Sequence, residues 1–157
     1  MLLSEVFLPE FIKYDLKGTT KDEIFEEMVD HFCRITQKNV KKDILAALYE
    51  REALMSTGVL HGIAMPHGKT AAIDGIFGVL GVSRHGINYD AMDGKPVYLI
   101  FMIIAPPVKA ETHLHILQLV AKFMRKPSFY NGIINAQNEK EVYEVIKSYE
   151  DQFLHCA

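Results

Sequence analysis

One histidine in the sequence stands where its side chain could do chemistry. Residues 62–68 read GIAMPHG, so we expect a short buried strand that Pro66 ends, followed by a loop that carries His67 and Gly68. Proline fixes its own φ and stiffens the approach, while glycine leaves the histidine ring accessible and lets a ligand come close to the backbone. A histidine held in this way could be a nucleophile, a general base or a metal ligand. On residue types alone, an ordinary loop histidine explains the segment equally well.

A second pair of histidines, His113 and His115, has the spacing of a metal site on a strand. The apolar residues that follow are spaced as in a helix instead, and residues two apart on a helix point in nearly opposite directions. We therefore expect His113 to face inward, in line with Ile116 and Val120, and His115 to be more exposed. No Asp or Glu completes a known zinc motif, so the sequence predicts no metal site.

Arg51 is a third candidate for chemistry. It stands in the last turns of a predicted helix, where a cation also interacts favourably with the helix dipole. Taken alone, a surface arginine beside a neighbouring glutamate is the simpler interpretation. Among the remaining histidines, we expect His31 to be solvated and His85 to lie in a turn before Gly86, whereas His61 is ambiguous.

These side chains need a scaffold, and the apolar spacing predicts one made of strands and helices. Alternating or continuous apolar runs predict strands at residues 11–16, 62–65, 76–82 and 97–105. Helical spacing predicts four helices, each after a candidate capping residue: Thr20, Asn39, Thr112 and Asn138. The second of these helices should end near Leu54. We expect one α/β domain over residues 1–157, with a mixed β-sheet flanked by helices on both faces.

The composition excludes several classes of protein. The chain has 157 residues and a net charge of −3, which argues against nucleic acid as its partner. The longest apolar run, residues 97–108, is shorter than the roughly 20 residues that cross a bilayer, so no membrane insertion is expected. The N-terminus has no features of a secretion signal. Cys33 and Cys156 share no motif, so reduced thiols in a cytoplasmic protein are the simplest interpretation.

Four segments of the sequence match one known pattern, in order. They are Arg51-Glu52 with Ser56-Thr57-Gly58, the stretch GVLHGIAMPHG at residues 58–68, residues 90–97, and HLHIL at residues 113–117. Together they resemble the fructose/mannitol-type (type 2) enzyme IIA domains of the bacterial phosphotransferase system (PTS). The resemblance extends from about Leu16 to Ile146 and supports the expected α/β fold.

The resemblance implies a chemical role for the residues already singled out. His67 would be the phosphorylated histidine, which takes its phosphoryl group from the histidine phosphocarrier protein. His113 would be the second active-site histidine and Arg51 the active-site arginine, whose planar donors suit a phosphoryl group. The amides of Thr57 and Gly68 are further candidate donors to its oxygens. No metal, nucleotide or other cofactor is implied, because the phosphoryl donor is already a phosphohistidine.

Two branches of that family fit the sequence. In sugar transport, the phosphoryl group passes to a cysteine of an enzyme IIB; in the nitrogen-regulatory branch, the phosphorylation state controls binding to target proteins. Residues 111–122 (ETHLHILQLVAK) resemble a helix of the regulatory branch, whereas residues 93–96 look equally fructose-like. We favour the regulatory branch and keep sugar transport as the alternative. The sequence names neither a sugar nor a regulatory target.

Overall fold

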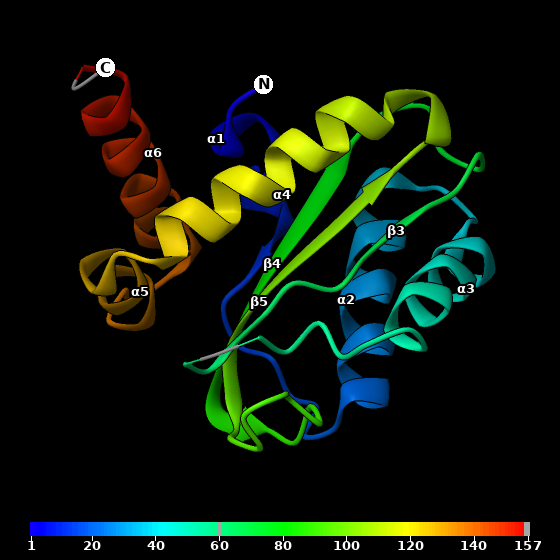
Figure 1. Cartoon of the computed structure of the whole chain (residues 1–157), viewed down its shortest axis with the longest axis horizontal. Coiled ribbons are helices and arrows are strands. Elements are labelled where there is room, and N and C mark those ends of the chain that lie inside the picture. Colours follow the sequence, from blue (N-terminus) through cyan, green and yellow to red (C-terminus); the bar gives the residue numbers. More distant parts are fainter. Residues whose placement is uncertain (60, 156–157) are drawn as a thin grey trace.

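The computed structural model describes residues 1–59 and 61–155, which build a five-stranded mixed β-sheet (Figure 1). The strands are β1 (Ile12–Lys13), β2 (Ile63–Ala64), β3 (His67–Lys69), β4 (Phe77–Ile87) and β5 (Val97–Ala105). Strands β4 and β5 are antiparallel and form the centre of the sheet. β1 runs parallel to β4 at one edge, while β2 and β3 run parallel to β5 at the other.

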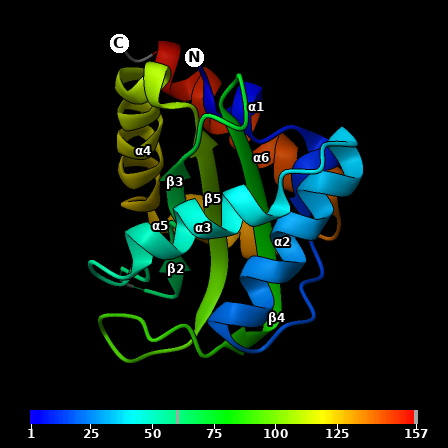
Figure 2. The ribbon, with the colours of Figure 1, turned by 90° about the vertical axis from the view of Figure 1, so that its right-hand side faces the viewer.

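Helices cover both faces of this sheet, as the sequence predicts. They are α1 (Leu3–Val6), α2 (Lys21–Thr36), α3 (Lys41–Glu52), α4 (Ala110–Met124), α5 (Pro127–Ile134) and α6 (Glu139–His155), with 3-10 turns η1 (Pro9–Phe11) and η2 (Pro107–Lys109). Helices α2 and α3 lie on one face, and α1, α4, α5 and α6 lie on the other (Figures 1 and 2). The predicted α/β class with a mixed sheet is confirmed.

Strand β5 separates two hydrophobic cores. Its alternate side chains Leu99, Phe101 and Ile103 belong to the core under α4 and α6. The side chains between them, Ile100 and Met102, belong to the core under α2 and α3. Since side chains of a strand point alternately to its two faces, a strand covered on both sides must be apolar throughout. This two-sided burial explains the continuous apolar run in the sequence.

The edge strand that carries His67 is interrupted. Met65 and Pro66 separate β2 from β3, although both pieces pair with β5 in the same direction. His67 is the first residue of β3 and lies beside Ile103. The expectation that the chain enters a loop after Pro66 is therefore wrong. The ladder resumes at once, because the Pro66 carbonyl accepts a hydrogen bond from the Ile103 amide at 3.0 Å.

Two of the four predicted helix caps are confirmed. The Thr20 hydroxyl accepts from the Glu23 amide at 3.3 Å, and the Asn138 side chain accepts from the Glu141 amide at 3.0 Å. Such bonds satisfy amides that the first helical turn leaves free.

The other two predicted caps are wrong. Asn39 precedes Val40, which occupies the capping position of α3 without a side-chain bond. Thr112 lies inside α4, because η2 continues directly into a helix that begins at Ala110. Helix α3 ends at Glu52 rather than near Leu54.

The sequence did not predict α1 or α5, which are short. Helix α5 begins with Pro127, a residue that fits the first helical turn because its missing amide proton is not needed there. Strand β4 is longer than predicted, because it continues beyond Val82 through an irregularity in its pairing with β5 to Ile87. Among the described residues, no helix is long and apolar enough to cross a membrane.

Candidate functional site

A small hollow of about 310 Å³ lies where β3, α3 and α4 meet. In Figure 2, β3 lies between α4 and α3. The hollow is lined by Ala47, Glu50, Arg51, Leu54, His67, Gly68, Lys69 and His113. Three of these, Arg51, His67 and His113, are residues that the sequence singles out for chemistry. The fold brings them together from three elements that are distant along the chain.

The His67 ring is held in one tautomer by a backbone carbonyl. Its Nδ1 lies 2.8 Å from the carbonyl oxygen of Met65. Because a carbonyl oxygen only accepts, Nδ1 carries the proton, and in the neutral ring the free lone pair belongs to Nε2. Burial lowers the pKa of His67 and the charge of Arg51 adds to that effect, whereas the Met65 carbonyl and the charge of Glu52 oppose it. The half-buried ring is therefore neutral at pH 7 and presents a nucleophilic nitrogen.

His113 approaches His67 from the other side of the hollow. The two ring centroids are 5.7 Å apart, and the planes meet edge to face at 73°. His113 is only 1% exposed, and burial, followed by the charges of His67 and Lys69, lowers its pKa to about 4. Its Nε2 is buried without a hydrogen-bond partner among the described residues. A buried, neutral ring with one unsatisfied nitrogen is available to a ligand that enters the hollow.

His115 points away from this site, as the helical spacing predicts. It is exposed, whereas His113 is buried. No group of three or more side chains that could hold a metal is present in residues 1–59 and 61–155. The two histidines of the HLH segment thus lie in different environments, one buried and one exposed.

Two cationic side chains line the hollow. Arg51 stands in the last turn of α3, and its Nη1 donates to the Met55 carbonyl at 2.8 Å. Lys69 is two residues beyond His67, on the same face of β3, because side chains alternate along a strand. A neutral nucleophilic nitrogen beside an arginine and a lysine suits attack on an electrophile that carries negative charge.

Thr57 has other partners than those expected. Its amide donates to Oε2 of Glu52 at 2.9 Å, and its hydroxyl donates to Oε1 of the same carboxylate. The residue is 4% exposed and does not line the hollow. Its amide is therefore occupied within the protein, and Thr57 is not a free donor for a phosphoryl oxygen.

Gly68 does line the hollow, yet a helix rather than a ligand makes the close approach to it. A Cβ at this position would lie 2.7 Å from the carbonyl carbon of Ala47 in α3. Glycine is needed here so that α3 can pack directly on β3. That packing sets the distance between the helix that carries Arg51 and the strand that carries His67.

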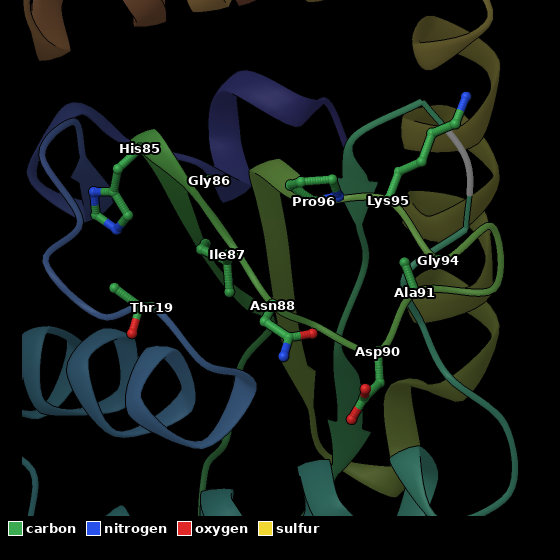
Figure 3. Close-up of a pocket in the computed structure, with 10 residues that line it drawn as sticks. All are labelled: Thr19, His85, Gly86, Ile87, Asn88, Asp90, Ala91, Gly94, Lys95 and Pro96. Atoms are coloured by element: carbon green, nitrogen blue, oxygen red, sulfur yellow. The ribbon is translucent and has the colours of Figure 1, made fainter.

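Three further histidines, His31, His61 and His85, lie outside this hollow. His85 is in β4 rather than in a turn, and its Nε2 bonds to the Gly18 carbonyl at 2.9 Å. His31 is half-buried, and its Nε2 bonds to the Glu10 carbonyl at 2.8 Å. His85 also lines a separate hollow of about 510 Å³, whose side chains spread apart, with Lys95 directed away from Thr19 and His85 (Figure 3). The side chains that line this second hollow do not converge on a common point.

The comparison with protein families gives a direct result. The model of the family described as "Phosphoenolpyruvate-dependent sugar phosphotransferase system, EIIA 2" matches residues 5–149. The chain belongs to this family. It is therefore an EIIA component of the PTS, a class of phosphoryl-transfer proteins.

Curated relatives of this EIIA protein come from both branches. The fructose-specific EIIABC component of Bacillus subtilis is 28% identical over 150 residues, which are 96% of this chain and 24% of that protein. The nitrogen regulatory protein of Bradyrhizobium diazoefficiens is 29% identical over 93% of this chain and 95% of its own. The fructose-specific EIIA component of Haloferax volcanii is 32% identical over 87% of this chain and 89% of its own. The chain thus spans about a quarter of the Bacillus protein but most of the other two.

Solved structures agree with the EIIA fold. The nitrogen regulatory protein IIA-Ntr of Neisseria meningitidis superposes with a TM-score of 0.84 at 29% identity, over 92% of this chain and 98% of that one. The enzyme IIAMtl in a complex with phosphorylated enzyme IIBMtl from Escherichia coli gives a TM-score of 0.73 at 18% identity. The match covers 88% of this chain and 95% of that one. The second likeness concerns the fold alone.

Sequence reasoning missed two features of the EIIA site. Lys69 was overlooked because His67 was expected in a loop; in a strand, the residue two positions on shares its face. The Met65 carbonyl, which fixes the His67 tautomer, carries no signal in residue types, since every residue has a carbonyl.

Proposed function

We propose that this EIIA protein accepts a phosphoryl group on Nε2 of His67 and then passes it on. The observation that carries the proposal is the bond from His67 Nδ1 to the Met65 carbonyl, which leaves the lone pair on Nε2. That lone pair forms the new P–N bond as the P–N bond of a phosphohistidine donor breaks, and the electron pair of the broken bond returns to the donor ring. His67 keeps its Nδ1 proton, and the Met65 carbonyl stabilises the positive charge that develops on the ring.

The other residues of the hollow stabilise the charge of the phosphoryl group. Arg51 and Lys69 supply positive charge beside its oxygens. His113 is neutral at pH 7, and its unpartnered Nε2 serves as a donor in the low-dielectric side of the hollow. It stands in the first turn of α4, where the helix dipole also favours an anion. Positioning and charge stabilisation of this kind require no metal or cofactor.

The partner that delivers the phosphoryl group is, in this proposal, the histidine phosphocarrier protein, in the cytoplasm. Leu54 lines the hollow and is 80% exposed, so an apolar side chain stands open beside the reacting histidine. Such a residue suits a transient protein contact that excludes water around the transferred group.

We place the protein in the nitrogen-regulatory branch, where the phosphorylation state of His67 would control binding to target proteins. The likeness to the Neisseria protein supports this branch, because it extends over nearly the whole of both chains. The alternative is sugar transport with an enzyme IIB as acceptor, and the 32% identity to the Haloferax fructose component supports it. Incubation of the phosphorylated protein with an enzyme IIB separates the branches, because only a transport component is discharged.

Phosphorylation in a reconstituted system tests the proposal. The protein is incubated with phosphoenolpyruvate, enzyme I and the histidine phosphocarrier protein, and its mass is measured before and after acid treatment. We expect an acid-labile gain of one phosphoryl group that is absent in His67→Ala and present in the control His115→Ala, since His115 is exposed and outside the hollow. No gain in the wild-type protein, or a gain that persists in His67→Ala, overturns the proposal.

A further inference from the structure

Glu52 occupies an unusual place beside the site. It is the neighbour of Arg51 at the end of α3, yet its carboxylate turns away from the hollow and its side chain is only 5% exposed. It accepts bonds from the Thr57 amide and the Thr57 hydroxyl, and it pairs with Lys21 Nζ at 3.0 Å. A buried carboxylate with this many donors is fixed in position.

Tyr89 completes this buried group. Its hydroxyl lies 2.7 Å from the Thr57 hydroxyl oxygen and 3.5 Å from Glu52 Oε1. Burial and the charge of Glu52 raise the pKa of Tyr89, so its hydroxyl stays protonated. Because the Thr57 hydroxyl gives its own proton to Glu52, Tyr89 donates to Thr57. Every proton in the group is thereby directed toward the Glu52 carboxylate.

The backbone continues this chain of bonds to the reacting histidine. The Thr57 carbonyl accepts from the Met65 amide at 2.9 Å. The Met65 carbonyl in turn accepts from Nδ1 of His67 at 2.8 Å. One backbone–backbone bond and one bond from the ring therefore connect Thr57, which Glu52 holds, with the nitrogen whose proton sets the tautomer of His67. Gly58, which follows Thr57, and Ala64, which precedes Met65, form an antiparallel β-bridge. This bridge holds the Thr57 segment beside the Met65 segment.

We propose that Glu52 is a positioning residue: through Thr57 and Met65 it orients the His67 ring with its proton on Nδ1, and its charge stabilises the ring as Nε2 takes up a phosphoryl group. This inference rests on the proposed function of His67. The charge of Glu52 already acts on that ring, since it raises the pKa of His67 against the larger effect of burial. Its positional effect passes through the backbone, because the Thr57 carbonyl holds the Met65 amide and the Met65 carbonyl holds the His67 ring.

The test compares Glu52→Gln with the wild-type protein in two measurements. The ¹⁵N chemical shifts of the two His67 ring nitrogens report the tautomer without any phosphorylation. The rate of phosphorylation is measured at several concentrations of phosphocarrier protein. This gives two separate quantities, the rate at saturation and the concentration at which half that rate is reached. We expect the Nδ1–H tautomer to lose population and the saturating rate to fall about 10- to 100-fold, the range found when a group that orients a metal-ligating histidine is lost. The half-saturating concentration should change less than about twofold, because the Glu52 side chain is buried and does not line the hollow.

Glu26→Gln is the matched control, because Glu26 is an exposed glutamate that pairs with Lys41 outside the site. It should change neither measurement. A folded Glu52→Gln protein with wild-type ring shifts and a wild-type rate overturns the inference. If Glu52→Gln does not fold, Thr57→Val is measured instead, because it removes only the hydroxyl that donates to Glu52. A loss of the Nδ1–H tautomer that is smaller than the loss expected for Glu52→Gln supports the inference. Unchanged chemical shifts of the ring nitrogens overturn it. If the wild-type protein accepts no phosphoryl group, the proposed function fails, while the ring shifts still decide the role of Glu52.

Discussion

The rings of His67 and His113 meet edge to face with their centroids 5.7 Å apart, although one is the first residue of β3 and the other lies in the first turn of α4. This contact joins the edge of the sheet to the helix that crosses its face. It places a nucleophilic nitrogen beside a buried ring with an unsatisfied nitrogen. In the proposed function, His67 accepts the phosphoryl group and His113 stabilises its charge.

The low pKa of His113 predicts how stability changes with pH. Its pKa is about 4 in the folded protein and 6.5 as an unperturbed group, so between these values the unfolded chain binds a proton that the folded protein does not. The free energy of unfolding therefore falls as the pH is lowered from 6.5 to 4, by up to about 1.4 kcal/mol per pH unit for this one proton. His113→Phe keeps a ring but binds no proton, so its stability should fall less steeply. Urea unfolding at several pH values measures both slopes.

His115→Phe is the control for this prediction, because His115 is an exposed histidine of the same helix. Its pH dependence should follow that of the wild-type protein. If His113→Phe keeps the wild-type slope, His113 does not titrate at a depressed pKa in the folded protein.

Arg51 is predicted to act through its charge and its planar donors. Arg51→Met removes both, and we expect the rate of phosphorylation of His67 to fall about 100- to 1,000-fold, the loss that follows removal of a donor to a developing negative charge. Arg51→Lys should recover part of the rate, because it keeps the charge and loses the fork of donors. The measurement is the phosphorylation rate at saturating phosphocarrier protein. Arg125→Met, at an exposed arginine outside this hollow, should keep the wild-type rate, and an equal loss there would contradict a specific role for Arg51.

The periodic parts of the fold could be read from the sequence. Helical spacing separated His113 from His115 correctly, because a residue's face on a helix depends only on its position in the repeat. The unbroken apolar run of β5 indicated its burial on both faces for the same reason. Such inferences require no knowledge of which elements meet.

The partners of Thr57 could not be read in this way. Its place in a familiar segment suggested a free amide, but the groups that occupy it are Glu52 and, through the hydroxyl, Tyr89. Tyr89 comes from a distant part of the chain, and no local pattern specifies that contact. The tautomer of His67 depends on a backbone carbonyl, which is present at every residue and gives no signal until the chain is folded.

The packing of α3 on β3 predicts a strong effect of a single methyl group. Gly68→Ala would place a Cβ 2.7 Å from the backbone of Ala47, so the helix must move away from the strand. Overpacking of this kind lowers the free energy of unfolding by about 1–3 kcal/mol. Since α3 also carries Arg51, the phosphorylation rate should fall as well. Gly75→Ala is the control, because the nearest atom to its Cβ is 3.7 Å away, and its stability should change by less than about 0.5 kcal/mol. Equal free energies of unfolding for the two variants would show that α3 can move away from β3 without loss of stability.

A buried carboxylate far from the site secures the N-terminal segment. Glu150 of α6 is 4% exposed and accepts from the amides of Leu3, at 2.5 Å, and Ser4, at 3.1 Å. Glu150→Ala leaves both buried amides without that acceptor, so we expect the free energy of unfolding to fall by about 2–4 kcal/mol. The amides of Leu3 and Ser4 should also exchange with solvent much faster. Glu144→Ala, at an exposed position of the same helix, should be nearly neutral. Unchanged exchange at Leu3 and Ser4 in Glu150→Ala would mean that the first helix does not depend on this carboxylate.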